Sequence, residues 1–160
     1  MKNLEQGEQI TKGAGKGAID VVGKDVESAI TRLKGLGAND EMINKILAKG
    51  AEISQTIFIA KNSRIIAWLQ DGPIGWGWKH IVNQGHDIHI QTALKLPNKE
   101  AAVKSVIKDT IENYDSVEYI AGDSYNFYKN YTIDGKIKRI LVVVSDRPNV
   151  EGRIITAYPD

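Results

Sequence analysis

Hydrophobic residues recur at helical spacing in the first part of the chain, and this pattern predicts helices there. The first apolar stripe consists of Val22, Val26, Ile30 and Leu33. Gly35 interrupts it, and a second helix is predicted from an N-cap at Asn39 or Asp40 to a stop at Gly50. The apolar runs at 57–60 and 65–69 fit either strand pieces or a buried helix. We therefore expect residues 1–70 to form a mainly helical segment.

The pattern changes after Asp71-Gly-Pro73, a chain-breaking sequence at which we place a domain boundary. A short helix is predicted between Gly75 and Gly85. A longer amphipathic helix is predicted after an N-cap at Asn98, with an apolar stripe of Val103, Val106, Ile107, Ile111 and Tyr114.

Three β segments are predicted after this helix. The segments 125–133 and 136–144 flank Asp134-Gly135, a strong short signal for a β-hairpin. A two-residue turn at this point pairs Ile133 with Lys136, Tyr131 with Lys138, and Phe127 with Val142. The last segment covers residues 153–158. The predicted fold class is α+β, with two helices packed on an antiparallel sheet over residues 71–160.

The last strand carries hydroxyl groups and a cation in the sequence Gly-Arg-Ile-Ile-Thr-Ala-Tyr-Pro-Asp at 152–160. Strict alternation in a strand places Ile154, Thr156 and Tyr158 on one face. Arg153 then lies on the other face, and it reaches Thr156 only through a bulge near Gly152 or from the strand end. Two hydroxyls side by side on a sheet face suit the binding of a phosphate.

Composition narrows the functional classes. The 160 residues include no cysteine, which excludes disulfides and thiolate metal ligands. The net charge is only +1, which counts against a broad nucleic-acid-binding surface but leaves room for one local cationic pocket. No apolar run approaches the roughly 20 residues of a membrane span, and the polar N-terminus is unlike a signal peptide.

The three histidines, His80, His86 and His89, lie within ten residues of each other. An imidazole titrates near neutrality and can transfer protons. His80 follows Lys79 at a corner rich in glycine and tryptophan, and we expect it to transfer a proton beside that cation. For His86 two interpretations stay open, namely proton transfer and a structural cation at a helix C-terminus. His89 alternates with isoleucines, which favours a half-buried structural role.

A metal site is the alternative use of these histidines, because His86 and His89 are three residues apart. However, the HExxH pattern is absent and Asp87 is the only carboxylate nearby, so no metal is expected. The neighbouring tryptophans, Trp76 and Trp78, are expected to be core and rim residues, with stacking on RNA bases as the less favoured alternative.

Two short stretches together resemble the metal-independent ribonucleases of the barnase/EndoU/colicin/RelE-like (BECR) fold. The first is Gly77-Trp-Lys79-His80-Ile81, and the second is Gly-Arg-Ile-Ile-Thr-Ala-Tyr-Pro at 152–159. The order and spacing of the two stretches carry the resemblance, which covers residues 75–160. Such domains are common as C-terminal toxin regions of contact-dependent growth inhibition (CdiA) and other polymorphic toxin proteins. Residues 1–70 would then be a delivery segment.

The resemblance implies cleavage of RNA without a metal or cofactor. The 2′-hydroxyl attacks the adjacent phosphorus and leaves a 2′,3′-cyclic phosphate and a 5′-hydroxyl. The resemblance implies that His80 transfers a proton, and His86 is a further candidate for this role. The charge of the phosphorane is stabilised by Lys79 or Arg153. The phosphate is held by Thr156 and Tyr158, and Tyr158 is also a candidate second proton donor.

The same resemblance implies a biological setting. The expected substrate is RNA, with tRNA preferred, and a cognate immunity protein protects the producing cell. Some related toxins need the translation elongation factor that carries aminoacyl-tRNA, so such a partner is conceivable here. The toxin would be delivered from the cell surface as part of a larger protein and would act in the cytoplasm of the target cell.

Two other functions stay open at this point. One is a non-enzymatic interaction module whose tyrosine-rich hairpin pairs with a partner strand. The other is a metal-dependent nuclease that uses the three histidines and loses activity with a chelator.

Overall fold

Helices and antiparallel strands follow one another in blocks, which gives the α+β class that the sequence predicts. The computed structural model describes residues 16–160, with side chains from residue 26 onward, so the first 15 residues of the predicted helical segment lie outside it. The helices are α1 (Lys16–Gly35), α2 (Asp40–Ala48), α3 (Trp78–Asn83), α4 (His86–Ala93) and α5 (Glu100–Glu112), with a 3₁₀ turn at Ile53–Gln55. The strands are β1 (Thr56–Lys61), β2 (Ile66–Gln70), β3 (Ser116–Ile120), β4 (Ser124–Ile133), β5 (Lys136–Ser145) and β6 (Ile154–Pro159).

The helices α1 and α2 form as the apolar spacing predicts. Asn39 is the N-cap of α2, and its side chain accepts a hydrogen bond from the backbone N–H of Met42 at 2.9 Å. Leu33 of α1 and Ile46 of α2 are almost fully buried. They belong to a hydrophobic cluster that also includes Ile53, which lies in the 3₁₀ turn after α2.

Residues 56–70 form an antiparallel hairpin, which decides the point that the sequence leaves open between strand and helix. One face of the hairpin, with Phe58 and Leu69, packs into the core of the C-terminal part. The other face, with Ile59 and Trp68, packs against α1 and α2. The hairpin therefore contributes to both hydrophobic clusters, and the domain boundary near residue 71 stays a prediction.

The larger sheet has four antiparallel strands in the order β3-β4-β5-β6. The hairpin at Asp134-Gly135 and its predicted register are confirmed, since Ile133 pairs with Lys136, Tyr131 with Lys138, and Phe127 with Val142. Strand β3 is an addition to the prediction. Its side chains are mostly exposed at the sheet edge, so it carries little hydrophobic signal.

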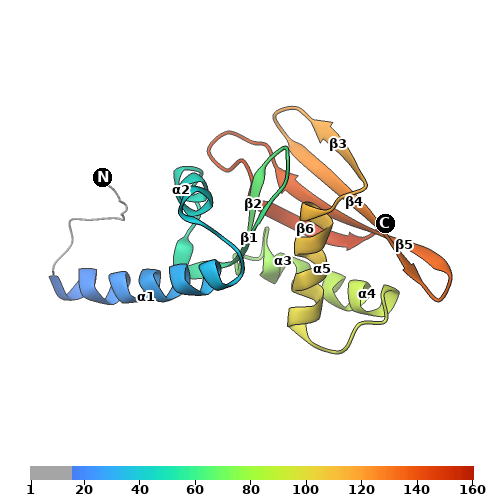
Figure 1. The fold of residues 1–160 in the computed structure, drawn as a ribbon, viewed down its shortest axis with the longest axis horizontal. Helices are drawn as coiled ribbons and strands as arrows, with labels where there is room; N and C mark the ends of the chain where they lie inside the picture. The colour runs from blue at the N-terminus through green and yellow to red at the C-terminus, as the bar shows by residue number, and fades with distance from the viewer. Residues whose placement is uncertain (1–15) are drawn as a thin grey trace.

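Three helices, rather than the predicted two, cover one face of this sheet. In Figure 1, α5 crosses in front of the strands, and α3 and α4 lie beside its lower end. Trp78, Ile90 and Ile107, one from each helix, are buried in one cluster with sheet residues such as Val142. The extra helix is α4, and it places His89 on an exposed surface instead of in the half-buried position expected from strand-like alternation.

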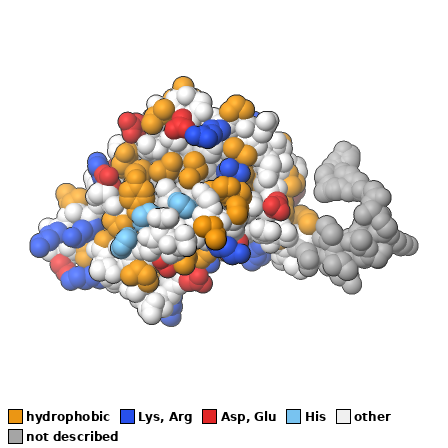
Figure 2. All heavy atoms as spheres, turned by 180° about the vertical axis from the view of Figure 1, so that it is seen from behind, with side chains coloured by type: hydrophobic (Ala, Val, Ile, Leu, Met, Phe, Trp, Pro, Cys, Tyr) orange, Lys and Arg blue, Asp and Glu red, His pale blue; other side chains and the backbone are white. Residues whose placement is uncertain are grey.

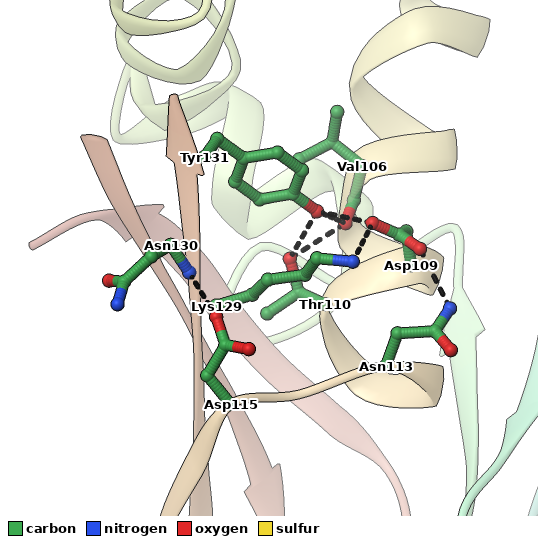
Figure 3. A network of polar contacts seen from close by, with 8 residues as sticks. All are labelled: Val106, Asp109, Thr110, Asn113, Asp115, Lys129, Asn130 and Tyr131. Carbon is green, nitrogen blue, oxygen red and sulfur yellow. Dashed lines mark hydrogen bonds and ion pairs between the residues drawn. The ribbon is translucent and has the colours of Figure 1, made fainter. Parts of the chain in front are cut away.

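A polar network ties α5 to β4 (Figure 3). Asp109 accepts hydrogen bonds from Tyr131 Oη at 2.8 Å and from Asn113, and it pairs with Lys129 at 2.8 Å. Tyr131 Oη also lies 3.2 Å from the hydroxyl of Thr110. These contacts anchor α5 across the sheet at a defined position.

A β-bulge in β6 corrects the predicted arrangement of side chains at the end of the chain. Val144 pairs with Ile154, but Val143 pairs with Thr156, so Ile155 is an extra residue in β6. Ile154 therefore lies on the helix-covered face, whereas Thr156 lies with Val143 on the opposite, open face. The prediction that Ile154 and Thr156 share a face is wrong because the bulge shifts the alternation by one residue.

Candidate active site

The bulge brings the polar residues of the last strand together on the open face of the sheet. Tyr158 pairs with Leu141, two positions from Thr156, so both side chains lie on this face. Arg153 immediately precedes Ile154, which is buried on the opposite face. Alternation and the bulge at Ile155 therefore place Arg153 on the same side as Thr156, and the bulge lies three residues after Gly152, near which the sequence predicts it.

The start of α3 is fixed against the edge of β6. The backbone N–H of Gly77 donates to the carbonyl of Ile155 at 3.0 Å. Gly77 has a φ of +81°, and a Cβ there would lie 2.5 Å from the carbonyl oxygen of Gln70. Only glycine fits this corner. The corner sets where the next turn of α3, with His80, stands relative to the strand.

His80 is oriented by the backbone. Its Nδ1 lies 2.9 Å from the carbonyl oxygen of Ile74. Because a carbonyl only accepts hydrogen bonds, Nδ1 carries a proton in this contact, and Nε2 is left to accept a proton when the ring is neutral. A fixed tautomer of this kind is what a general base requires.

His86 lies directly against Tyr158. Their ring centroids are 5.0 Å apart, and His86 Nδ1 is 3.5 Å from Nδ1 of His89. Burial lowers the pKa of His86, and the neighbouring His89 and His80 lower it further, against a smaller opposite effect of Asp87. The His86 ring is therefore mainly neutral at pH 7, in the form that accepts a proton.

His86 stands between two helices. It is the first residue of α4 and follows Gly85, whose left-handed conformation and hydrogen bond to Val82 close the C-terminus of α3. A positive charge is favoured at a helix C-terminus and disfavoured at an N-terminus, and the role of His86 stays a prediction. Figure 2 shows the histidine side chains gathered on one face, among hydrophobic side chains.

Arg153 is held by an aromatic ring rather than by a carboxylate. Its guanidinium lies 3.8 Å from the ring centroid of Trp76, a cation–π contact. Burial lowers the pKa of Arg153, and its Nε atom is buried without a hydrogen-bond partner in residues 16–160. Trp76 is half-buried and Trp78 is buried in the core, which confirms the expected rim and core positions.

Thr156 presents a second unpartnered polar group. Its Oγ1 is buried and accepts or donates no hydrogen bond within the described part of the chain. A buried hydroxyl without a partner costs about 1–3 kcal/mol, so such groups are uncommon and point to a ligand. Arg153 Nε, one residue before β6, and Thr156 Oγ1, within it, are thus two unpartnered groups that can donate to an anion, whereas the third unpartnered atom, Glu151 Oε1, is an acceptor.

The side chain of Lys79 lies in a different place from the other predicted site residues. Its ammonium group lies 3.5 Å from a carboxylate oxygen of Asp71, and its side chain is largely exposed. It lines a shallow hollow together with Ile74, Trp78 and Glu100, none of which lies in the His86–Tyr158 cluster. Of the two cations considered for charge stabilisation, Arg153 is therefore the better placed.

The open face contains two further residues, Tyr128 and Arg139, that were not predicted as site residues from the sequence. Tyr128 of β4 and Tyr158 of β6 both pair with Leu141, so they flank it on the same face. The guanidinium of Arg139 lies 4.6 Å from the ring centroid of Tyr128, and Arg139 pairs with Asp160. The hairpin register predicted from Asp134-Gly135 contains this signal, since it already aligns residues 128 and 141.

No protein-family model and no curated protein matches this chain. Among residues 16–160, no group of three or more His, Asp or Glu side chains has the arrangement of a metal site. None of the helices described is both long and apolar enough to cross a membrane.

Proposed function

We propose that this protein is a metal-independent endoribonuclease with its active site on the open face of β6. The observation that carries this proposal is the contact of His86 with Tyr158 on a strand that also carries the unpartnered Thr156 Oγ1 and is preceded by the unpartnered Arg153 Nε. It combines a neutral imidazole, a phenol, a hydroxyl and a guanidinium. These are the groups that phosphodiester transesterification requires.

In the proposed reaction, the 2′-oxygen of RNA forms a bond to the adjacent phosphorus while the bond from phosphorus to the 5′-oxygen breaks. A neutral imidazole, from His86 or His80, takes the proton of the 2′-hydroxyl. Tyr158 gives a proton to the departing 5′-oxygen. Arg153 and Thr156 bind the non-bridging oxygens, whose negative charge increases in the phosphorane. The products are a 2′,3′-cyclic phosphate and a 5′-hydroxyl.

The biological setting follows from the BECR resemblance and is part of the proposal. We propose tRNA as the substrate and a role as the toxin region of a contact-dependent growth inhibition protein. A cognate immunity protein would cover the open face, and an elongation factor is a further proposed partner. The toxin would act in the cytoplasm of the target cell.

The test is incubation of the purified chain with total bacterial RNA, with and without EDTA and with and without cell extract. We expect discrete tRNA fragments that end in a 2′,3′-cyclic phosphate. Of His86→Ala and His80→Ala, the variant that removes the base should lower the rate by about 10²–10⁴-fold, the usual contribution of a proton-transfer group, and the comparison identifies which histidine it is. Cleavage that needs extract would add a host factor to the mechanism.

A pair of matched tyrosine variants separates chemistry from stability. Tyr158→Phe should lower the cleavage rate, whereas Tyr119→Phe removes a hydroxyl that is bonded to Asp146 at the exposed edge strand and should leave the rate unchanged. Intact RNA under all conditions would favour the interaction module. Cleavage that EDTA abolishes would favour the metal-dependent nuclease.

A further inference from the structure

A hollow of about 460 Å³ lies between α2 and the turn that joins β1 to β2. Its lining includes four cationic side chains from three separate elements, namely Lys45, Lys49, Lys61 and Arg64. Two carboxylates, Glu41 and Glu151, also line it. The hollow therefore has an excess of two positive charges in a protein whose net charge is only +1.

The carboxylates hold two of the lysines in place. Lys61 lies 3.7 Å from Glu41, and Lys49 lies 3.2 Å from Glu151. The Lys61–Glu41 pair joins two exposed side chains and is therefore weak, so a phosphate oxygen can replace this carboxylate at little cost. Glu151 is half-buried, so its pair with Lys49 is retained. Lys45 forms no ion pair with any residue that the structure describes, and it is available to an anion.

The turn on the other side of the hollow is rigid. Asn62 Oδ1 accepts hydrogen bonds from the backbone N–H groups of Arg64 at 2.8 Å and Ile65 at 3.1 Å. Asn62 Nδ2 donates to the carbonyl of Ile111 in α5 at 2.8 Å. These bonds fix the backbone of the turn at Arg64 before any ligand binds, which reduces the entropy lost on binding.

The hollow adjoins the candidate active site. Glu151 in its lining precedes Arg153 by two residues, and the intervening Gly152 accepts a hydrogen bond from the N–H of Trp68 at 2.9 Å. Ile66, also in the lining, lies against Gly152, because a Cβ on that glycine would be 2.2 Å from the Ile66 carbonyl oxygen. An RNA strand that extends from Arg153 toward Glu151 would reach the cationic hollow next.

We propose that this hollow binds the phosphate backbone of RNA outside the cleaved linkage. The inference rests on the proposed ribonuclease function and adds a substrate requirement to it. The enzyme selects RNA that is long enough to occupy both the active site and the hollow, and it binds short oligonucleotides weakly. A local cationic pocket also explains how a nearly neutral protein binds a polyanion.

The experiment compares two substrates with two variants of the full chain. The substrates are tRNA and a short oligonucleotide centred on the cleaved linkage. The test variant is the double substitution Lys45→Gln with Arg64→Gln. The control is Lys136→Gln with Lys138→Gln, which removes the same charge at the far end of β5. Thermal unfolding confirms that both variants remain folded.

In the test variant, the KM for tRNA should rise about tenfold, with kcat and the oligonucleotide kinetics unchanged, as expected for two exposed cation–phosphate contacts. The salt dependence of tRNA binding should become shallower by about 1.4 in log–log slope, from two fewer single-strand phosphate contacts. The control variant should show neither change.

If the KM for tRNA does not rise, or if the KM rises by the same factor for both substrates, the inference is wrong. Either result leaves the ribonuclease proposal intact. If the test variant cleaves tRNA normally but is no longer inhibited by a co-expressed immunity protein, the inference is also wrong. The hollow would then bind a protein partner. A parent chain that cleaves neither substrate is the separate failure of the proposed function.

Discussion

At the scale of single residues, the candidate site is defined by buried polar groups that form no hydrogen bond within the described part of the chain. Arg153 Nε and Thr156 Oγ1 are buried without partners among residues 16–160. Most buried polar groups in proteins are hydrogen-bonded, so these exceptions, to which Glu151 Oε1 also belongs, mark this end of the chain as a candidate ligand site.

The acidic limb of the pH profile tests the proton-transfer role of His86. Burial and the neighbouring histidines lower the pKa of His86 below the ordinary histidine value of 6.5. A base with a lowered pKa stays neutral to lower pH, so kcat/KM should fall only below this value. His89→Gln removes one of these neighbours, and the limb should move toward higher pH. A limb that does not respond to His89→Gln would assign the base to another group.

The same shift affects stability in a defined direction. Because the folded protein disfavours the charged form of His86, the unfolded state binds more protons as the pH falls below 6.5. This group therefore destabilises the fold at acidic pH and has no such effect above that range.

Gly152 tests the close packing of β2 against the start of β6. Its φ is +104°, and an added Cβ would lie 2.2 Å from the carbonyl oxygen of Ile66. Gly152→Ala should lower the free energy of unfolding by roughly 3 kcal/mol, from backbone strain and steric overlap. The measurement is denaturant unfolding.

The matched control is Gly122→Ala. Gly122 also has a positive φ, +75°, but open space surrounds its Cβ direction. It should cost about 1 kcal/mol from strain alone. Equal losses in the two variants would show that the contact with Ile66 contributes nothing.

At the scale of elements, α5 is held on the sheet by polar as well as apolar contacts (Figure 3). Burial acts to raise the pKa of Asp109, but hydrogen bonds from Lys129, Tyr131 and Asn113 outweigh it, and the net pKa is lowered. The Asp109 carboxylate therefore stabilises the fold above its unfolded pKa of 3.8, and this contribution is lost as the pH falls through the lower folded value.

Asp109→Asn should lower the free energy of unfolding by about 1 kcal/mol at pH 7, because the site is partly exposed and the ion pair is screened. The difference from the parent should vanish at a pH below the folded pKa of Asp109. Asp134→Asn is the control, since Asn also favours the turn conformation before Gly135. Denaturant unfolding as a function of pH measures both variants, and a difference that persists in acid would contradict the electrostatic account.

The elements also differ in how well the sequence predicts them. The hairpin register was predictable because Asp134-Gly135 sets it locally. Helix α4 was not, because Ile90 is buried while Ile88 and His89 are exposed, so its apolar stripe is narrow and resembles alternation. Strand β3 is specified mainly by pairing with β4, which leaves its exposed side chains without a pattern.

At the scale of the whole molecule, the β1–β2 hairpin joins the two hydrophobic clusters. Its two faces pack on opposite sides, and Trp68 also pairs with Arg153 at the start of β6. The hairpin thus supports the strand that carries the candidate site. This packing has a direct consequence for fragments of the chain.

A fragment of residues 71–160 should fail to fold, because it lacks Phe58, Leu69 and their neighbours, which are buried in the main core. A fragment of residues 51–160 keeps that core and should fold with lower stability, since Ile59 and Trp68 lose their cover from α1 and α2. Circular dichroism and thermal unfolding of the two fragments measure this. A cooperatively folded 71–160 fragment would support the domain boundary predicted near residue 71.

Features that depend on local spacing could be predicted from the amino-acid sequence alone. It specified the helices α1, α2, α3 and α5, the β4–β5 hairpin with its register, and the set of residues, His80, His86, Arg153, Thr156 and Tyr158, from which the candidate site is built. Periodicity, capping and turn chemistry act over a few residues, so they can be read along the chain.

Which of these residues lie close together depends on strand pairing and helix packing. The bulge at Ile155 moves Thr156 and Tyr158 to the open face, and it depends on how β6 pairs with β5. The contact of His86 with Tyr158 depends on α4 packing beside the same strand. Strand pairing and helix packing join residues that are far apart in the chain, and no local pattern encodes such an offset of one residue.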